Sequence, residues 1–193
     1  MHGMRYVYEW LFPAVWVAYL LYWQIAARGA KANERIESVG SRIFRTALLL
    51  AGVVLMSVAW IPGAWLYRRL LPMTVEMFWL GAAVTVAGLL FCVWARVTLG
   101  RNWSRSVTIK QGHELITRGP YGLVRHPIYT GLLTGFAGTA IALGQVRGVV
   151  ALVLIFASLW YKLQLEEKWM RGQFGEVYAS YVRHTKALVP WVL

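Results

Sequence analysis

The sequence predicts an all-α membrane protein with about five transmembrane helices, and three observations support this. Of the 193 residues, 59% are hydrophobic and only 15% are charged, against about 25% charged residues in soluble domains. The apolar residues gather in segments close to the roughly 20 residues that a spanning helix needs. Basic residues are concentrated in alternate connections between these segments. A disordered chain, a coiled coil and an ordinary soluble domain are therefore excluded.

Each apolar segment is expected to form one helix. The first is rich in Trp and Tyr and lacks a small-residue cleavage site, so it is expected to be retained rather than removed as a signal peptide. The last two are short and are joined by few residues around Gln145, which predicts a tight helical hairpin. The five predicted spans are 8–27, 43–62, 75–95, 128–144 and 148–163.

The basic residues predict the orientation of the chain. Sixteen of the 20 Lys and Arg residues fall in the 28–45 connection, the 96–125 connection and the C-terminal tail, which five spans would place on one side. The positive-inside rule assigns that side to the cytoplasm and the N-terminus to the outside. This topology accounts for the net charge of +12 without nucleic acid as a partner.

The residue types limit the available chemistry. The chain has eight Glu and no Asp, so carboxylate chemistry must come from glutamates. The single Cys92 lies in an apolar run, which excludes an intrachain disulfide and a cysteine-based metal site. No metal site is predicted.

The first polar block ends in a motif at the predicted start of the fourth helix. Residues 112–131 read G-H-E-L-I-T-R-G-P-Y-G-L-V-R-H-P-I-Y-T-G. Pro127 suits the first helical turn, because its missing N–H has no helical partner there. Arg125 and His126 then lie at a helix N-terminus, where free N–H groups and the helix dipole favour an anionic ligand. The alternative is a basic helix end anchored to lipid phosphates.

The second polar block follows the fifth span. Glu166 and Glu167 lie about one turn beyond it, and residues 174–181 resemble an amphipathic helix with Phe174, Tyr178 and Tyr181 on one face. The alternatives are that the glutamates pair with nearby Lys or Arg residues at helical spacing, and that the aromatic face serves packing.

These motifs, in this order, resemble the isoprenylcysteine carboxyl methyltransferase family. The family consists of integral-membrane enzymes that use S-adenosyl-L-methionine, and the resemblance covers roughly residues 96–190. It implies that the fourth and fifth helices and a cytoplasmic cap formed by the tail enclose the cofactor. The cofactor-binding residues that it implies are His113, Leu115, Tyr121, Arg125, His126, Pro127, Tyr129, Glu166 and Glu167.

The chemistry of the cofactor agrees with these residue types. Arg125 and His126 suit its carboxylate, a glutamate suits its ammonium or hydroxyl groups, and the tyrosines can contact the adenine or the cation. The residues expected to be catalytic are His126, Arg125 and Glu167, and the task of each glutamate is left open. Arg101 and Arg105 are expected to bind an anionic substrate group, with anchoring to lipid phosphates as the alternative.

The whole chain is interpreted as one membrane domain. Residues 1–95 form an acceptor-side scaffold, and residues 96–193 form the methyltransferase core. The predicted function is methyl transfer to a lipophilic acceptor at the boundary of membrane and cytosol, with an isoprenylcysteine-like carboxylate favoured. The alternatives are a phospholipid amine or thiol methyltransferase, an NADPH-dependent reductase related to sterol reductases, and a non-enzymatic membrane component. The partners are therefore the bilayer and a lipophilic or lipidated substrate, and no oligomeric state is predicted.

Overall fold

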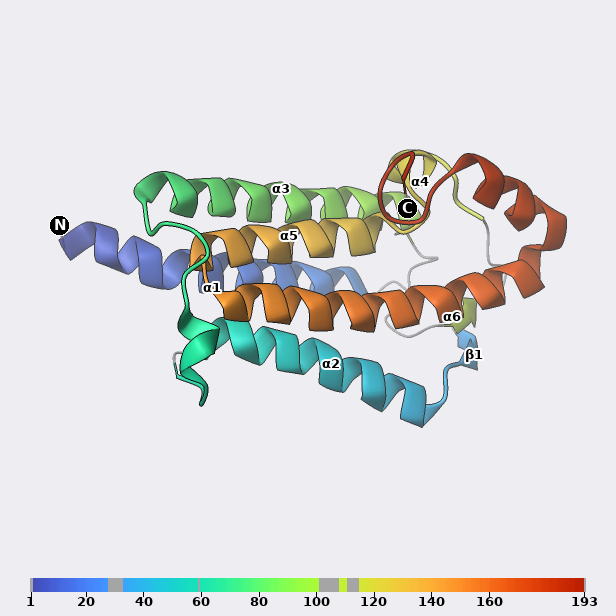
Figure 1. Cartoon of the computed structure of the whole chain (residues 1–193). Coiled ribbons are helices and arrows are strands. Elements are labelled where there is room, and N and C mark those ends of the chain that lie inside the picture. Colours follow the sequence, from blue (N-terminus) through green and yellow to red (C-terminus); the bar gives the residue numbers. More distant parts are fainter. Residues whose placement is uncertain (1, 28–32, 59, 101–107, 111–114, 193) are drawn as a thin grey trace.

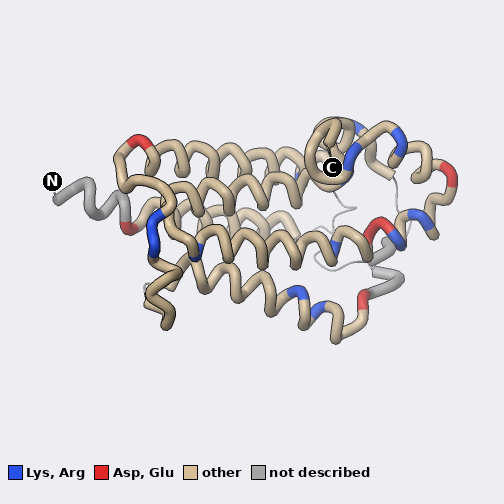
Figure 2. Tube along the Cα trace, viewed as in Figure 1, with Lys and Arg blue, Asp and Glu red and all other residues tan. Residues whose placement is uncertain are grey.

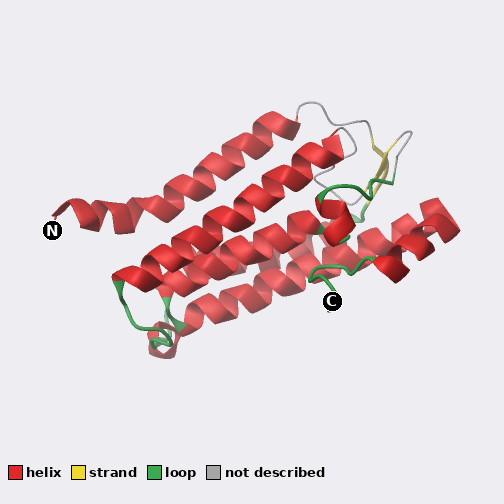
Figure 3. Cartoon of the chain, turned by 90° about the horizontal axis from the view of Figure 1, so that it is seen from above, coloured by secondary structure: helices red, strands yellow, loops and turns green. Residues whose placement is uncertain are grey.

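Five long helices form an elongated bundle in the computed structural model (Figures 1 and 3). The structure describes residues 2–27, 33–58, 60–100, 108–110 and 115–192, and of 2–8, 33–36 and 108–110 it describes the backbone alone. The long helices are α1 (His2–Ala26), α2 (Val39–Ser57), α3 (Val75–Leu99), α5 (Pro127–Leu143) and α6 (Val146–His184). The short elements are β1 (Asn33–Ile36), the 3-10 helix η2 (Ala64–Tyr67), β2 (Thr108–Lys110) and α4 (Pro120–Leu123).

A helix occurs at each of the five predicted places, and the all-α membrane class is confirmed. Among the described helices, three are long and apolar enough to cross a membrane, namely α2, α3 and α6. The helix α5 is apolar but shorter. The number of spans and the orientation of the chain therefore stay predictions.

The predicted hairpin is confirmed, but its second helix extends beyond the expected end at residue 163. Gly144 ends α5 in the left-handed conformation (φ 63°), and α6 begins two residues later. The helix continues past Glu167 because the Lys, Leu, Gln and Glu residues there are good helix formers. Gly175 (φ 51°) breaks it, and the last segment turns back toward α4 (Figure 1). The predicted amphipathic helix is thus partly a continuation of α6.

Glycines bring α3 and α5 into close contact. A Cβ at Gly138 would approach the carbonyl oxygen of Gly81 to 2.5 Å, and a Cβ at Gly131 would meet the Cys92 sulfur at 2.5 Å. Small residues allow helix backbones to approach in this way in membranes. Gly131 and Gly138 of α5 therefore serve packing against α3.

We expect Gly138→Ala to lower stability by about 1–3 kcal/mol, the usual cost of overpacking a tight contact. Gly172→Ala is the matched control, because a Cβ there meets nothing within 4 Å. That change should be neutral or stabilising by up to about 1 kcal/mol, because alanine favours helices. Thermal unfolding in detergent would measure both, and equal midpoints would contradict the packing role of Gly138.

The two ends of the bundle differ. At one end, Arg147 donates to the carbonyl of Val58 at 2.6 Å and lies over the ring of Tyr67. There it satisfies a carbonyl at the end of α2. The other end carries α4, the extension of α6, the C-terminus and many of the charged residues (Figures 1 and 2). There β1 and β2 form a two-stranded antiparallel ladder, which the sequence analysis did not predict.

Candidate functional site

The motif around Arg125 builds the start of α5. Gly119 (φ 61°) precedes the single turn of α4, and His126 is the residue that caps α5. Pro127 occupies the first turn of α5 and is buried, as predicted. The side chains of Arg125 and His126 therefore lie at the end of the bundle that carries α4.

The C-terminal residues 185–188, here called the strap, bind this helix start through four consecutive carbonyls. The carbonyl of Thr185 accepts from the Arg125 guanidinium, and that of Lys186 accepts from the Arg125 N–H at 2.8 Å. The next two carbonyls accept from the His126 N–H at 3.0 Å and the Thr130 hydroxyl at 2.7 Å. The N–H groups of Arg125 and His126 are thus occupied by the strap. The anion-binding role expected for the start of α5 therefore stays a prediction.

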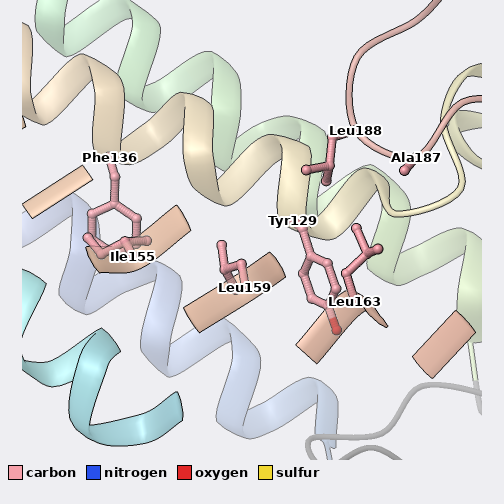
Figure 4. Close-up of a cluster of buried hydrophobic side chains, with 7 residues drawn as sticks. All are labelled: Tyr129, Phe136, Ile155, Leu159, Leu163, Ala187 and Leu188. Carbon is pink, nitrogen blue, oxygen red and sulfur yellow. The ribbon is translucent and has the colours of Figure 1, made fainter. Parts of the chain in front are cut away.

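The strap also completes the hydrophobic core between α5 and α6. Ala187 and Leu188 are buried with Tyr129, Phe136, Ile155, Leu159 and Leu163 (Figure 4). Tyr129 reaches from α5 toward Leu163 of α6, and the strap residues lie close by (Figure 4). The position of Tyr129 therefore depends on apolar packing as well as on its polar neighbours.

Glu167 is the centre of a buried ion-pair network. Arg125 donates to one of its carboxylate oxygens through Nε at 2.9 Å and Nη2 at 2.6 Å. His126 Nε2 lies 3.3 Å from the same oxygen, and Arg171 Nη2 lies 3.4 Å from the other oxygen. Burial alone would raise the pKa of Glu167, but the hydrogen bonds from His126 and Arg125 outweigh it and lower the pKa to about 2. Glu167 is therefore a permanent carboxylate at neutral pH.

Glu166 faces a different set of side chains. Its carboxylate lies 3.7 Å from His126 Nδ1 and 3.7 Å from Lys162 Nζ, and it interacts with Tyr129. The Tyr129 ring stacks in parallel with His126, with centroids 5.4 Å apart, and Lys162 Nζ lies 5.3 Å from the same ring. His126 thus stands between the two glutamates, with one ring nitrogen toward each.

An open polar cavity of about 310 Å³ adjoins Glu167. Gln164, Lys168 and Arg171 line it with Glu167, and all four lie on one face of α6. This volume is at the lower end of the range of small-molecule sites. Both signs of charge are present, which suits a ligand that carries a carboxylate and an ammonium group.

The structure brings together most of the predicted site residues that it describes. Arg125, His126, Tyr129, Glu166 and Glu167 form one cluster with Pro127 at its base. Tyr121 is buried, and its carbonyl accepts from the Tyr181 hydroxyl. Leu115 is half-buried in the segment that leads to α4. Arg101, Arg105 and His113 lie outside the described residues.

The aromatic face predicted for residues 174–181 takes part in this cluster. Tyr178 is 2% exposed and interacts with Arg125, and its ring packs edge-on against Tyr181 at 6.0 Å. Burial raises the pKa of both tyrosines, which keeps their hydroxyls protonated. These residues therefore help to enclose Arg125, in agreement with the packing interpretation of the aromatic face.

Sequence reasoning assigned no site role to three charged residues near Glu166, namely Glu37, Arg45 and Lys162. Lys and Arg residues near the two glutamates, of which Lys162 is one, were considered only as ion-pair partners at helical spacing. Glu37 and Arg45 precede Lys162 by more than 110 residues. No local pattern in the sequence signals that they approach it.

The pairing of Glu167 predicts how stability depends on pH. Because folding lowers its pKa from 4.5 to about 2, its contribution to stability is fully present above pH 4.5 and is lost as the pH falls toward 2. The difference between the unfolding midpoints of the wild type and of Glu167→Gln, measured in detergent between pH 3 and 7, should become smaller toward the acidic end. A constant difference across that range would contradict this pairing.

The fold and this cluster define a helical membrane protein with a charged, ligand-sized site at one end of its bundle. Residues 77–177 match the phospholipid methyltransferase family, which is more than half of the chain. The chain belongs to this family. The sequence-based recognition of a methyltransferase of this class is thereby confirmed.

Curated relatives include enzymes named as isoprenylcysteine methyltransferases. Protein-S-isoprenylcysteine O-methyltransferase B of Arabidopsis thaliana is 27% identical over 115 residues, which are 58% of each chain. A probable protein-S-isoprenylcysteine O-methyltransferase of Oryza sativa subsp. indica is 28% identical over 154 residues, covering 76% of this chain and 81% of the relative. The cobalt-zinc-cadmium resistance protein CzcN of Cupriavidus metallidurans is 32% identical over 95 residues, covering 48% and 44%. The chain thus spans less than two thirds of the first of these relatives.

Proposed function

We propose that this protein transfers a methyl group from S-adenosyl-L-methionine to a lipophilic carboxylate at the boundary of membrane and cytosol. The observation that carries the proposal is the position of His126 between two glutamates, beside a polar cavity where the apolar bundle ends. A polar cofactor and a membrane-dissolved acceptor can meet only at such a boundary. Relatives named as O-methyltransferases support oxygen as the methylated atom.

The cofactor fits the cavity side of the cluster. Glu167 offers a carboxylate for the ammonium or ribose hydroxyl groups, and Arg171 and Lys168 offer cations for the cofactor carboxylate. Arg125 donates hydrogen bonds to Glu167 through two of its nitrogens and to the strap through the third. This favours a role for Arg125 in positioning Glu167. Tyr121, Tyr129 and Pro127 are proposed as walls of the site, together with Leu115. For His113 a role in cofactor binding is proposed from the resemblance alone.

When bound, S-adenosyl-L-methionine supplies an electrophilic methyl group on a sulfonium ion. A carboxylate oxygen that receives this methyl forms an O–C bond as the S–C bond breaks, and the two charges cancel. No proton moves, so the site needs alignment of the reacting atoms more than a strong base. For an amine acceptor, His126 would have to accept a proton.

The family description keeps a phospholipid amine as the second candidate acceptor. It would require His126 to face the acceptor with a free lone pair, whereas a carboxylate requires only a nearby cation. A comparison of acceptor classes with the purified protein separates these candidates.

The first test is calorimetric titration of the detergent-purified protein with S-adenosylhomocysteine, with NADPH in parallel. We expect micromolar binding of S-adenosylhomocysteine alone, and at least tenfold weaker binding by His126→Ala. His184→Ala is the matched control, because His184 is exposed at the end of α6. Binding of NADPH alone would instead support a reductase, and binding of neither would support a non-enzymatic role.

A further inference from the structure

Arg45, from the N-terminal half of the chain, lies beside the cluster. It donates through Nε and Nη2 to Glu37, whose side chain is fully buried just before α2. Arg45 also interacts electrostatically with Tyr129 and Glu166. The helix α2, which lies outside the region matched to the methyltransferase family, therefore contributes a cation next to the candidate site.

Lys162 places a second cation in the same region. Its side chain is 13% exposed, and its Nζ lies 3.7 Å from a Glu166 carboxylate oxygen, with which it forms an ion pair. It also interacts electrostatically with Arg45 and Glu37. Two cations, each paired with a glutamate, thus share one partly buried region.

The two sides of His126 have different surroundings. On the Glu167 side are Arg125 and the polar cavity. On the Glu166 side are Lys162 and, from α2, Arg45. Of the two glutamates, Glu167 lines the cavity proposed for the cofactor and Glu166 does not, which favours different tasks for them.

Two exposed aromatic side chains are neighbours in the sequence of these two cations. Phe44 and Tyr161 directly precede Arg45 and Lys162 in the sequence, and their rings meet edge-on at 5.6 Å. They are 54% and 42% exposed. Ser158 of α6 donates to the carbonyl of Arg45 at 2.6 Å, which holds α2 and α6 together at this level. Exposed tyrosine rings such as that of Tyr161 are typical of the level where a bilayer meets water.

We propose that Lys162 and Arg45 bind the anionic head of the lipophilic acceptor, with its apolar tail against Phe44 and Tyr161. Lys162 contacts the acceptor carboxylate, and Arg45, fixed by Glu37, supplies the second positive charge. This inference rests on the proposed methyl transfer and adds the residues that select an acidic acceptor. In this proposal the acceptor is recognised by one residue of α2, Arg45, and one residue of α6, Lys162.

The test is direct binding, without turnover. The full-length protein in detergent is titrated with N-acetyl-S-farnesylcysteine, which carries a free carboxylate, and with its neutral amide. We expect the wild type to bind the acid at least about tenfold more tightly than the amide, since a hydrogen bond to a charged group is typically worth that much. Lys162→Met should abolish this preference, and Lys162→Arg should keep most of it.

Two further variants separate the possible outcomes. Arg45→Gln should also reduce the preference for the acid, whereas Arg42→Gln, an exposed arginine one turn earlier in α2, should not. S-adenosylhomocysteine binding should stay within about twofold of wild type in the Lys162 variants. If Lys162→Met weakened that binding and left the acid preference intact, Lys162 would serve the cofactor and the inference would be wrong.

The failure of the proposed function gives a different result. A wild type that binds no S-adenosylhomocysteine would refute the methyltransferase proposal, whatever its affinity for the lipid. A wild type that binds S-adenosylhomocysteine but does not prefer the acid to the amide would overturn only the inference about Lys162 and Arg45.

Discussion

Glu167→Ala is expected to abolish binding of S-adenosylhomocysteine and to destabilise the protein by about 3–5 kcal/mol, the usual cost of removing one partner of a buried ion pair. The alanine would remove the carboxylate that pairs with Arg125, and the Arg125 guanidinium, whose side chain is only 9% exposed, would remain as a buried charge without that ion pair. His126 would lose the carboxylate beside Nε2. Calorimetric titration and thermal unfolding in detergent would measure the two effects.

Glu176→Ala is the matched control, because Glu176 is an exposed glutamate in the same helix. It should change the stability by no more than about 0.5 kcal/mol, as exposed substitutions usually do, and should leave binding unchanged. Normal ligand binding by Glu167→Ala would refute the role of this glutamate in the cofactor site. Destabilisation without loss of binding would assign Glu167 a structural role alone.

Truncation of the chain after His184 is expected to cost about 5 kcal/mol or more. It removes a buried leucine, worth about 2–5 kcal/mol, and four carbonyl acceptors, each worth about 1 kcal/mol. Two of these carbonyls accept from the N–H groups of Arg125 and His126. Because Ala187 and Leu188 also pack in the cluster that contains Tyr129, binding of S-adenosylhomocysteine should be lost together with stability.

A shorter truncation is the control for this experiment. Removal of residues 191–193 leaves the strap intact, and Trp191 and Val192 are exposed. That truncation should preserve binding and the unfolding midpoint. Leu188→Ala, which keeps the backbone carbonyls, should give an intermediate loss of stability. Wild-type binding after truncation at His184 would show that the strap does not organise the site.

The helices could be predicted from the sequence because their signals are local. In a bilayer each backbone polar group must be satisfied within the spanning segment, so a long apolar run indicates a helix without further information. Pro127 marks the start of α5, and Gly144 marks its end, through their own backbone preferences. The end of α6 was missed because the apolar run stops near residue 163, whereas the helix continues on residues with high helix propensity.

The pairing of charges could not be predicted in this way. Arg125 and Glu167 were both predicted to be site residues, yet nothing in their spacing showed that they bind each other. The N–H groups of Arg125 and His126 donate to carbonyls 61 positions further along the chain, and no local pattern indicated this. Such contacts depend on how distant segments meet.

Composition and local patterns were therefore enough to establish the membrane class, the helix positions and the motif residues, since each depends on neighbours along the chain. The folding of the chain in three dimensions assigned Glu167 to Arg125 and the cavity, and Glu166 to Lys162 and α2. Adjacent residues of a helix point about 100° apart. Two consecutive glutamates thus enter different environments, and only the packing of the other elements around α6 determines which environment each one meets.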